Sequence, residues 1–311
     1  MLSESKIQEL IEMKDVVASV EEALRREGMG EVANTMRTRS RGSGSLLSVM
    51  HANLSYLGRG GLKAYMSSKA GTNFVLVLFD AADSAPLAVM GADIIGRFRT
   101  GAASGVATKH LYGRKSGTLA MFGSGRQALT QVLAAGAVMD LEGVRVWSPT
   151  PGHRGAFADA LSGRGIRARA CATPGEAVEG AQVASTITSS SEPFLTAEML
   201  RNVSHANLCG GNVPGHSEVT PSALGSFDTV AVDDIPQARM EYGDLIRAAE
   251  AGAFSWGSAV ELSSVVAGRR KGEGRTLFKS GGAALEDVAV ASMLYDKAIE
   301  SGRAYPRVEL S

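Results

Sequence analysis

The stretch from Thr118 to Ala137 constrains the fold more than any other part of the chain. It reads TLAMFGSGRQALTQVLAAGA, in which an apolar run meets Gly-Ser-Gly and is followed by about ten residues with apolar side chains at helical spacing. This order predicts a strand, a tight turn and a helix. Gly123 permits the turn, Gly125 lets a ligand approach the backbone, and the N–H groups that open the helix can bind a dinucleotide pyrophosphate. Gly-Ser-Gly alone also fits an ordinary glycine turn; Ala128 replaces the third glycine of the fingerprint, which is a permitted variant.

Length and charge narrow the classes of function. A chain of 311 residues can bury a sizeable core and is expected to form two domains. It carries 32 basic and 32 acidic residues, so no bulk electrostatic field would attract nucleic acid or an anionic membrane. We therefore expect a protein that acts on small molecules, without a nucleic-acid or membrane partner.

The cysteines and the first residues bear on location. Cys171 and Cys209 lie in apolar runs, which predicts thiols without a disulfide and a cytoplasmic protein. The N-terminal residues lack the apolar core of a signal peptide, and the chain has no uninterrupted apolar run of about 18 residues.

The first third of the chain is expected to hold helices and then an antiparallel sheet. Apolar spacing predicts helices within residues 7–28, and glycine-rich turns between short apolar segments predict the sheet within residues 36–79. Lys63 stands alone in that sheet, downstream of a cluster of basic residues. The cluster consists of Arg37, Arg39 and Arg41. A solvated strand edge is the plain interpretation for Arg39 and Arg41.

Arg99 lies in a stretch rich in small residues, from residue 87 to residue 111. Small side chains allow a close approach of backbone or cofactor, and an arginine beside them can clamp a carboxylate with its planar fork. A salt bridge on a helix surface explains the same arginine equally well, so both interpretations stay open.

After the glycine turn, short apolar runs alternate with helical segments. The expected strands are residues 144–147, 166–171, 183–188, 206–210 and 229–233. Such alternation predicts a parallel sheet wound on both faces, with a ligand beyond the carboxyl ends of the strands. The turns at those ends carry Ser148, Thr188, Ser189 and Gly210–Asn212. The last helix, residues 284–300, follows a strand at 276–278 and is expected to return to the first domain.

The end of the second strand of a dinucleotide fold bears on the choice of cofactor. An acidic residue there holds the adenosine ribose and would repel a 2′-phosphate. This chain has Ser148 and Thr150, which can donate hydrogen bonds, and Arg154, which could meet a phosphate. The pattern favours NADP(H) over NAD(H), with NAD(H) left open because such residues are also common in surface loops.

Several motifs follow one another in a fixed order along the chain. They are Met36-Arg37-Thr38, Gly61-Leu62-Lys63, Phe98-Arg99-Thr100-Gly101-Ala102, Gly123-Ser-Gly-Arg-Gln127-Ala128, Gly210-Gly-Asn-Val-Pro-Gly215, Leu277-Phe-Lys-Ser-Gly-Gly282 and Leu285-Glu-Asp287. In this order they resemble the ornithine cyclodeaminase and mu-crystallin family over nearly the whole chain. The motifs are specific for the family and not for a substrate.

The resemblance implies an α/β fold, a Rossmann-type doubly wound parallel sheet inserted in an α+β substrate-binding and dimerisation domain. We expect that domain to comprise residues 1–113 and 283–311, and the NAD(P)-binding domain residues 114–282. The resemblance also implies a homodimer in which the sheets of two subunits pair into a barrel.

The resemblance further implies that Arg37, Lys63 and Arg99 grip the α-carboxylate of an amino or imino acid. Neighbouring arginines would depress the pKa of Lys63, which makes it the expected acid–base residue. Choosing Arg37 over Arg39 is a judgement of register, and Asn212 is expected near the nicotinamide. The expected cofactor-binding residues are Thr100, Gly123, Ser124, Gly125, Arg126, Gln127, Ser148, Thr150, Arg154, Thr188 and Ser189.

Departures from the family pattern decide between reactions. Ornithine cyclodeaminases place an aspartate at the position of Asn212 and a glutamate at the position of Ser48. Neither replacement can act as a general base or balance an ammonium. The sequence thus predicts an NAD(P)H-dependent oxidoreductase acting on the C=N or CH–NH bond of a small imino or amino acid. A cyclodeaminase with tightly bound NAD and a binding protein without turnover remain alternatives.

The other titratable residues have less distinctive settings. The five histidines are His51, His110, His153, His205 and His216. They are scattered without ligand spacing, so no metal site is expected. His216 directly follows the Val-Pro-Gly loop and is kept as a candidate substrate contact. Glu286 and Asp287 start the last helix, where they are expected to interact with its dipole rather than to act as catalytic acids.

Overall fold

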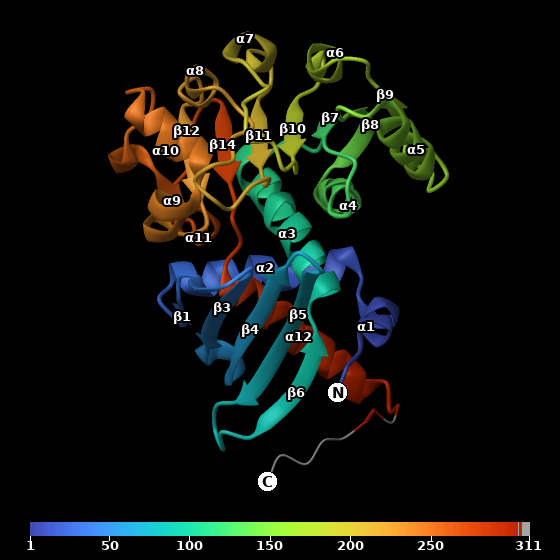
Figure 1. Cartoon of the computed structure of the whole chain (residues 1–311), viewed down its shortest axis with the longest axis vertical. Coiled ribbons are helices and arrows are strands. Elements are labelled where there is room, and N and C mark those ends of the chain that lie inside the picture. Colours follow the sequence, from blue (N-terminus) through green and yellow to red (C-terminus); the bar gives the residue numbers. More distant parts are fainter. Residues whose placement is uncertain (304, 307–311) are drawn as a thin grey trace. The chain divides into compact units, whose positions relative to one another are not determined.

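The computed structural model describes residues 1–303, 305 and 306. Its elements, most of them labelled in Figure 1, belong to two compact units, Met1–Arg99 with the chain from Gly282 onward, and Thr100–Gly281. The inserted unit is thus continuous in sequence, whereas the first unit is assembled from the beginning and the end of the chain.

An antiparallel sheet forms the first unit. Its strands run in the order β1-β3-β4-β5-β6, with β2 paired to β3. Their bounds are Val32–Asn34 (β1), Thr38–Gly42 (β2), Ser45–Leu54 (β3), Arg59–Ser68 (β4), Gly71–Asp80 (β5) and Pro86–Gly91 (β6). Register pairs such as Met50 with Lys63 and Lys63 with Leu76 define one face of this sheet. The antiparallel sheet expected from residues 36–79 is therefore present, and β6 extends it.

The two faces of that sheet differ in burial. Alternate residues of β3 point to opposite faces, so Met50 and Ala52 are buried while Leu47 and His51 are exposed. The helices of the unit are α1 (Glu4–Leu10), α2 (Met13–Gly28), the 3-10 turn η1 (Ser55–Leu57) and α12 (Ala284–Glu300). The last helix lies on the buried face, against β3, β4 and α2, as the sequence predicted.

The second unit is built on a parallel sheet. The strand order is β13-β12-β14-β11-β10-β7-β8-β9, and every neighbouring pair is parallel. The bounds are Ser116–Phe122 (β7), Asp140–Trp147 (β8), Ala168–Ala170 (β9), Val183–Thr186 (β10), His205–Leu208 (β11), Thr229–Val232 (β12), Val260–Glu261 (β13) and Thr276–Lys279 (β14). The chain winds outward from β7 in one direction and from β10 in the other, which creates a topological switch point between them.

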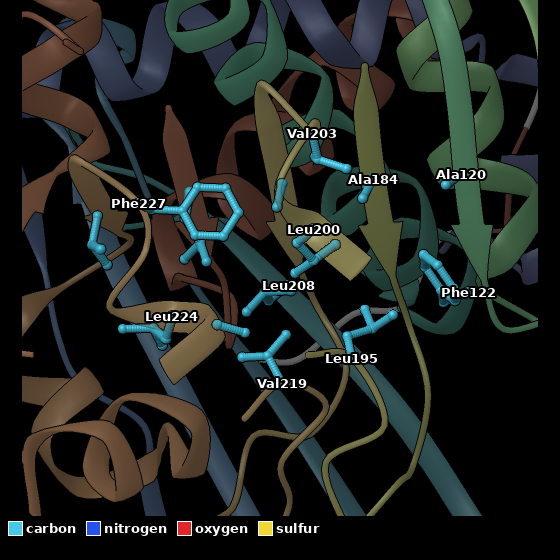
Figure 2. Packing of buried hydrophobic residues seen from close by; sticks show 14 of the residues in the cluster. Ala120, Phe122, Ala184, Leu195, Leu200, Val203, Leu208, Val219, Leu224 and Phe227 are labelled. Carbon is cyan, nitrogen blue, oxygen red and sulfur yellow. The ribbon is translucent and has the colours of Figure 1, made fainter. Parts of the chain in front are cut away.

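Helices cover both faces of the parallel sheet. They are α4 (Ala128–Val138), α5 (Pro151–Ser162), α6 (Pro174–Val178), α7 (Ala197–Leu200), α8 (Pro221–Leu224), α9 (Ile235–Glu241), α10 (Gly243–Glu250), η3 (Trp256–Ser258) and α11 (Leu262–Val266). Along β7, Leu119 and Met121 pack into one core, and Ala120 and Phe122 into the other. Figure 2 shows the second of these cores. Two separate cores on one sheet confirm the doubly wound prediction.

The division between the units falls inside α3 (Asp93–Ala107), which continues as the π-helix η2 (Thr108–Tyr112). The sequence placed this boundary later, after residue 113. The part of α3 from Thr100 groups with the parallel sheet because Gly101 packs against α4: a Cβ on Gly101 would lie 2.4 Å from the carbonyl oxygen of Thr130. The division of labour between the predicted domains stays a prediction.

The turn after β7 depends on one glycine. Gly123 has φ +108°, and a Cβ there would lie 2.9 Å from the carbonyl oxygen of Ile187. Both the backbone conformation and the close neighbour exclude a side chain. Helix α4 begins only at Ala128, so residues 123–127 form an open turn at the end of β7.

Two features are absent from residues 1–303, 305 and 306. None of the helices there has the length and hydropathy that a membrane span requires. Within the same residues, no three metal-ligating side chains of the His, Cys, Asp and Glu types come together.

Candidate active site

Three buried cations gather in the first unit. Arg37 lies just before β2, Lys63 in β4 and Arg99 in α3, with exposed fractions of 6%, 3% and 7%. Two carboxylates from the first turn of α12, Glu286 and Asp287, meet them and are completely buried. The sequence singled out the three cations from separate segments, and the structure brings Lys63 and Arg99 to one carboxylate.

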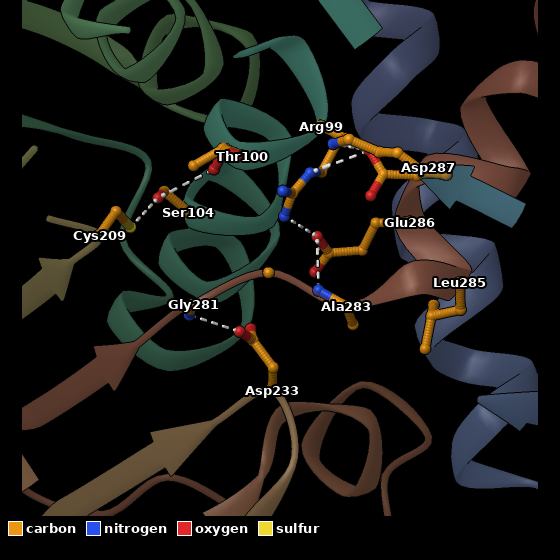
Figure 3. A network of polar contacts seen from close by, with 12 residues as sticks. Arg99, Thr100, Ser104, Cys209, Asp233, Gly281, Ala283, Leu285, Glu286 and Asp287 are labelled. Atoms are coloured by element: carbon orange, nitrogen blue, oxygen red, sulfur yellow. Dashed lines mark hydrogen bonds and ion pairs between the residues drawn. The ribbon is translucent and has the colours of Figure 1, made fainter. Parts of the chain in front are cut away.

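Asp287 joins two of these cations. Its Oδ1 accepts a hydrogen bond from Lys63 Nζ at 2.9 Å and lies 3.3 Å from Arg99 Nε. Arg99 also donates from Nη1 to Glu286 Oε2 at 2.9 Å, as Figure 3 shows. Arg99 is therefore the buried partner of two acids, and the surface salt bridge considered from the sequence is wrong.

A glycine completes the cluster. Arg37 donates from Nη2 to the carbonyl oxygen of Gly282 at 3.4 Å. A Cβ on Gly282 would lie 1.8 Å from Arg99 Nη1, and its φ of +86° disfavours a side chain independently. Of the neighbouring basic residues, Arg39 is half-buried and Arg41 exposed.

Burial and charge act on Lys63 in opposite directions. Burial lowers the pKa of its ammonium, Asp287 raises it, and the charges of Arg99 and Arg37 lower it further, so that the pKa lies below the ordinary 10.5. Burial alone would raise the pKa of Asp287, but Arg99 and Lys63 hold it below 3.8. Lys63 and Asp287 are thus in contact inside a buried site, where each affects the proton affinity of the other.

Two sequence expectations about this cluster need correction. The pKa of Lys63 is lowered as expected, but burial is the main cause and the arginines are secondary. Glu286 and Asp287 lie at the start of α12 as expected, yet their partners are Arg99 and Lys63 rather than the helix dipole alone. Residues more than 180 positions away in sequence supplied these partners, so the local pattern held no signal for them.

The sheet face beside Lys63 is aromatic. Lys63 Nζ lies 5.6 Å from the ring centroid of Phe74, and the rings of Phe74 and Tyr65 are 5.2 Å apart. Ser48 pairs with Tyr65 in the sheet and is completely buried, and its hydroxyl has no hydrogen-bond partner among the described residues. A buried hydroxyl of this kind can still accept or donate a hydrogen bond to a ligand.

The glycine turn of the second unit lies at the topological switch point. Gly125 is exposed, and a Cβ on it would meet no atom within 4 Å, so this part of the turn leaves space for a ligand. Arg126 and Gln127 are exposed beside it. The turn has the open backbone that a pyrophosphate requires.

Side chains at the end of β8 connect with this turn. Ser124 Oγ donates to Ser148 Oγ at 2.9 Å, and Arg154 Nη1 donates to the carbonyl oxygen of Ser148 at 2.9 Å. Thr150 is exposed at the N-cap of α5. The structure therefore brings Ser124, Ser148 and Arg154 together, next to where the second strand ends.

A buried glutamate organises the ends of β10 and β11. Glu218 Oε1 accepts from the backbone N–H and the hydroxyl of Thr188 at 2.8 and 2.7 Å. Its Oε2 accepts from Thr186 Oγ1 at 2.5 Å and from the backbone N–H of Gly210 at 3.1 Å. Burial raises the pKa of this carboxyl, while Lys279 and the threonine hydroxyls lower it.

Lys279 binds the same loops from β14. Its Nζ donates to the carbonyl oxygens of Gly210 and Gly211 at 2.6 and 3.3 Å and lies 2.9 Å from Asp244 Oδ2. Burial lowers the pKa of Lys279, but Asp244 and Glu218 outweigh this and raise it above 10.5. This second buried cluster fixes the backbone that precedes Asn212.

The remaining predicted residues occupy separate positions. Thr100 is buried in α3, where its carbonyl oxygen accepts from Gln131 Nε2 at 3.4 Å. Ser189 is exposed, and Asn212 and His216 are half-buried in loops of the second unit.

Sequence reasoning missed Glu218, Asp244 and Lys279. One signal was present, because Lys279 directly follows the apolar strand residues Leu277 and Phe278. A charged residue at the end of a buried strand calls for a partner. The partners themselves lie in distant segments and carry no local pattern.

Comparisons with known proteins agree with these features. A sequence model of the Ornithine cyclodeaminase/mu-crystallin family matches residues 1–302. A Delta(1)-pyrroline-2-carboxylate reductase from Bacillus cereus is 34% identical over 236 residues, which cover 74% of this chain and 72% of the relative.

Solved structures extend the likeness to the whole fold. The Thermococcus litoralis Delta(1)-pyrroline-2-carboxylate reductase, in complex with NADH and L-proline, has a TM-score of 0.90 at 32% identity, covering 97% of this chain and 98% of its own. An archaeal alanine dehydrogenase dimer with bound NAD has a TM-score of 0.89 at 27% identity, covering 100% and 98%.

Proposed function

We propose that the chain, which belongs to the ornithine cyclodeaminase/mu-crystallin family, is an NAD(P)H-dependent oxidoreductase that reduces the C=N bond of a small imino acid or oxidises the corresponding amino acid. The reductase and dehydrogenase relatives support this reaction class, since each acts on a small molecule with nitrogen on the carbon beside a carboxylate.

The charge of the cluster in the first unit carries the proposal. The cluster combines three cations, those of Arg37, Lys63 and Arg99, with two carboxylates, those of Glu286 and Asp287. Cations thus outnumber carboxylates among its members. This balance favours an anionic ligand, and an arginine fork is well suited to bind a substrate carboxylate.

Each cation of the cluster then has a role in the reaction. Arg37 and Arg99 bind and orient the carboxylate, and the burial of Arg37 favours it over Arg39 for this task. Lys63 donates a proton from Nζ to the imine nitrogen, which receives the electron pair of the C=N π bond. Solvent later returns a proton to Lys63. The nicotinamide, when bound, supplies the hydride that forms the new C–H bond.

Two residues, one in each unit, argue against cyclodeamination of a diamino acid. A second, distal ammonium would need a carboxylate to balance it. Ser48 offers a buried hydroxyl beside the Tyr65 and Phe74 rings, and Asn212 offers an amide. Neither group can carry the charge or act as a general base. The observations therefore favour a compact imino acid, and no contact favours the non-catalytic binding protein.

The second unit fits a nicotinamide dinucleotide. Gly123 to Gln127 supply an open turn for the pyrophosphate, with Thr188 and Ser189 at the neighbouring strand end and Thr100 in α3. Solved relatives hold NADH or NAD. We infer a preference for NADP(H) from Ser148, which replaces an acidic residue, and from Arg154, which is held on the Ser148 carbonyl and can meet a 2′-phosphate.

The assembly and the location are part of the proposal. The exposed face of the antiparallel sheet carries Leu47, Met66 and Val75, an apolar surface that a second copy of the chain would cover. The dimeric relative supports a homodimer. Residues 1–113 and 283–311 would then bind substrate and partner, and residues 114–282 the cofactor. The free thiols of Cys171 and Cys209 fit a cytoplasmic protein.

One assay tests the reaction and the cofactor together. The purified protein is mixed with NADPH or NADH and with cyclic imino acids such as pyrroline-2-carboxylate, or with 2-oxo acids plus ammonia. Oxidation of the cofactor with any of them supports the reductase; ammonia release from ornithine without net cofactor oxidation would point to the cyclodeaminase. Arg154→Ala is expected to lower kcat/KM for NADPH about tenfold relative to NADH, which corresponds to the loss of one charged hydrogen bond. Arg164→Ala, just after the end of α5, is the matched control.

A further inference from the structure

We propose that Asp287 is a positioning residue for the reaction: it holds Lys63 in place and keeps it protonated, so that the proton is available when the substrate carboxylate is bound. The inference rests on the proposed function for the identity of the reaction. The geometry that carries it lies entirely within the first unit and is independent of the cofactor.

Lys63 is confined on several sides. A Cβ on Gly96 of α3 would lie 3.0 Å from Lys63 Nζ, and the Phe74 ring lies 5.6 Å away. Asp287 Oδ1 accepts a hydrogen bond from Nζ at 2.9 Å. This contact fixes the direction of the ammonium, because the Lys63 side chain is buried and the backbone of α3 lies beside it.

The charges around Lys63 explain why a carboxylate is required. Arg99 and Arg37 are buried in the same cluster and repel a third positive charge, and burial itself disfavours the ammonium. Glu286 pairs with Arg99 at 2.9 Å. Asp287 contacts both Lys63 and Arg99, and is therefore the group placed to favour the protonated form of Lys63.

Asp287 has a further acceptor. Its Oδ2 is buried and has no hydrogen-bond partner among residues 1–303, 305 and 306, whereas its Oδ1 faces Lys63 Nζ and Arg99 Nε. A buried carboxylate oxygen without a donor is costly unless a ligand or a water supplies one. Asp287 thus holds Lys63 and Arg99 through Oδ1 alone, and this single oxygen makes the contact that positions the Lys63 ammonium.

The proton balance defines the consequence. Reduction of the imine consumes one proton, which leaves Lys63 Nζ and joins the nitrogen as the C=N π electron pair moves onto it. If Asp287 becomes an amide, the Lys63 ammonium loses its compensating charge and gives up its proton at lower pH. Carboxylate binding by Arg37 and Arg99 remains, because their charges exceed that of Glu286.

The kinetic test is the pH profile of Asp287→Asn. The alkaline limb of kcat is expected to move down by at least about one pH unit, a tenfold loss of proton affinity, while KM for the imino acid changes little. Glu286→Gln is the matched variant from the same helical turn. Glu286→Gln weakens the contact that orients Arg99, so it should raise KM for the imino acid without moving the alkaline limb of kcat. An unchanged alkaline limb in a folded Asp287→Asn protein would overturn the proposal.

A second measurement needs no turnover. Binding of L-proline to the full chain is measured by calorimetry at pH 8 in two buffers that differ in ionisation enthalpy. Asp287→Asn should take up more protons per carboxylate bound than the wild type, because the bound anion raises the proton affinity of its Lys63, which then takes a proton from the buffer. Equal uptake would count against the proposal.

The design separates two failures. A wild-type protein that oxidises no cofactor with any imino acid would remove the proposed reaction, but calorimetry would still decide the role of Asp287. Asp287→Glu keeps a carboxylate and should retain the wild-type alkaline limb. If Asp287→Asn does not fold, Asp287→Glu becomes the test. An alkaline limb of kcat that falls in Asp287→Glu by as much as was expected for Asp287→Asn would overturn the inference.

Discussion

Two buried lysines, Lys63 and Lys279, lie in clusters of similar composition but opposite balance of charged groups. Lys63, in the first unit, shares its site with two arginines and two carboxylates. Lys279, in the second unit, faces Asp244 and Glu218 and donates to two backbone carbonyl groups. Among these residues, cations outnumber carboxyl groups in the first site, and carboxyl groups outnumber cations in the second.

The pKa values follow this balance. Burial lowers the pKa of both lysines, but only Lys279 has enough negative charge nearby to raise it above 10.5. The carboxylates around Lys279 are also occupied by backbone donors, as in the contacts of Glu218 with Thr188 and Gly210. A cluster bound to backbone groups in this way holds loops in place, whereas one in which cations outnumber carboxylates is suited to bind an anion and move a proton.

The largest expected difference is in catalysis. Lys63→Met should lower kcat by about 10²- to 10⁴-fold, the usual contribution of general acid–base catalysis, with the fold retained because Arg99 still balances Asp287. Lys69→Met, an exposed lysine at the β4–β5 turn, serves as control. Turnover is measured with saturating cofactor and circular dichroism checks the fold. Near-normal kcat in Lys63→Met would break the comparison.

The next largest effect is on stability. Lys279→Met leaves Asp244 and Glu218 buried without their cation, and the expected loss is about 3–5 kcal/mol. Lys63→Met should cost clearly less, since Arg99 remains beside Asp287. Urea unfolding of both variants measures the difference. Equal losses would mean that the two clusters are structural to the same degree.

A smaller effect is expected at the glycine of the first cluster. Gly282→Ala and Gly268→Ala both place a side chain at positive φ, and each is expected to lower the free energy of unfolding by about 1–2 kcal/mol for this reason. Only Gly282 is close to a guanidinium, that of Arg99, since a Cβ on Gly268 would meet no atom within 4 Å. KM for the imino acid should therefore rise in Gly282→Ala alone. A similar KM in both variants would separate Gly282 from substrate binding.

The smallest effect is the pH dependence of stability. The folded-state pKa of Lys63 is below the unfolded 10.5, so the unfolded chain binds more protons in that window and stability rises with pH there. The pKa of Lys279 is above 10.5, so its contribution is complete below 10.5 and is lost above it. When the free energy of unfolding is measured from pH 6 to 11, the rise of stability with pH that Lys63 causes should disappear in Lys63→Met. Its persistence would contradict the pKa direction.

The parts of the fold that the sequence predicted are those with local causes. The Gly123 turn needs a positive φ, and the alternation of apolar segments after it gave the doubly wound sheet. Lys63 and Arg99 were chosen because they stand in family motifs. The strand at 276–278 was recognised, but its place between β11 and β12 was not, because pairing partners of a parallel strand are distant in sequence.

The candidate site shows the same limit. The sequence alone determined which side chains could bind a carboxylate, since residue type fixes charge and hydrogen-bonding capacity. Only the tertiary structure decided that Asp287 meets Lys63 across 224 positions, and that Glu218 and Asp244 surround Lys279. Coulomb energy and desolvation depend on the distances between groups and on their burial, and neither can be read from the order of residues in the chain.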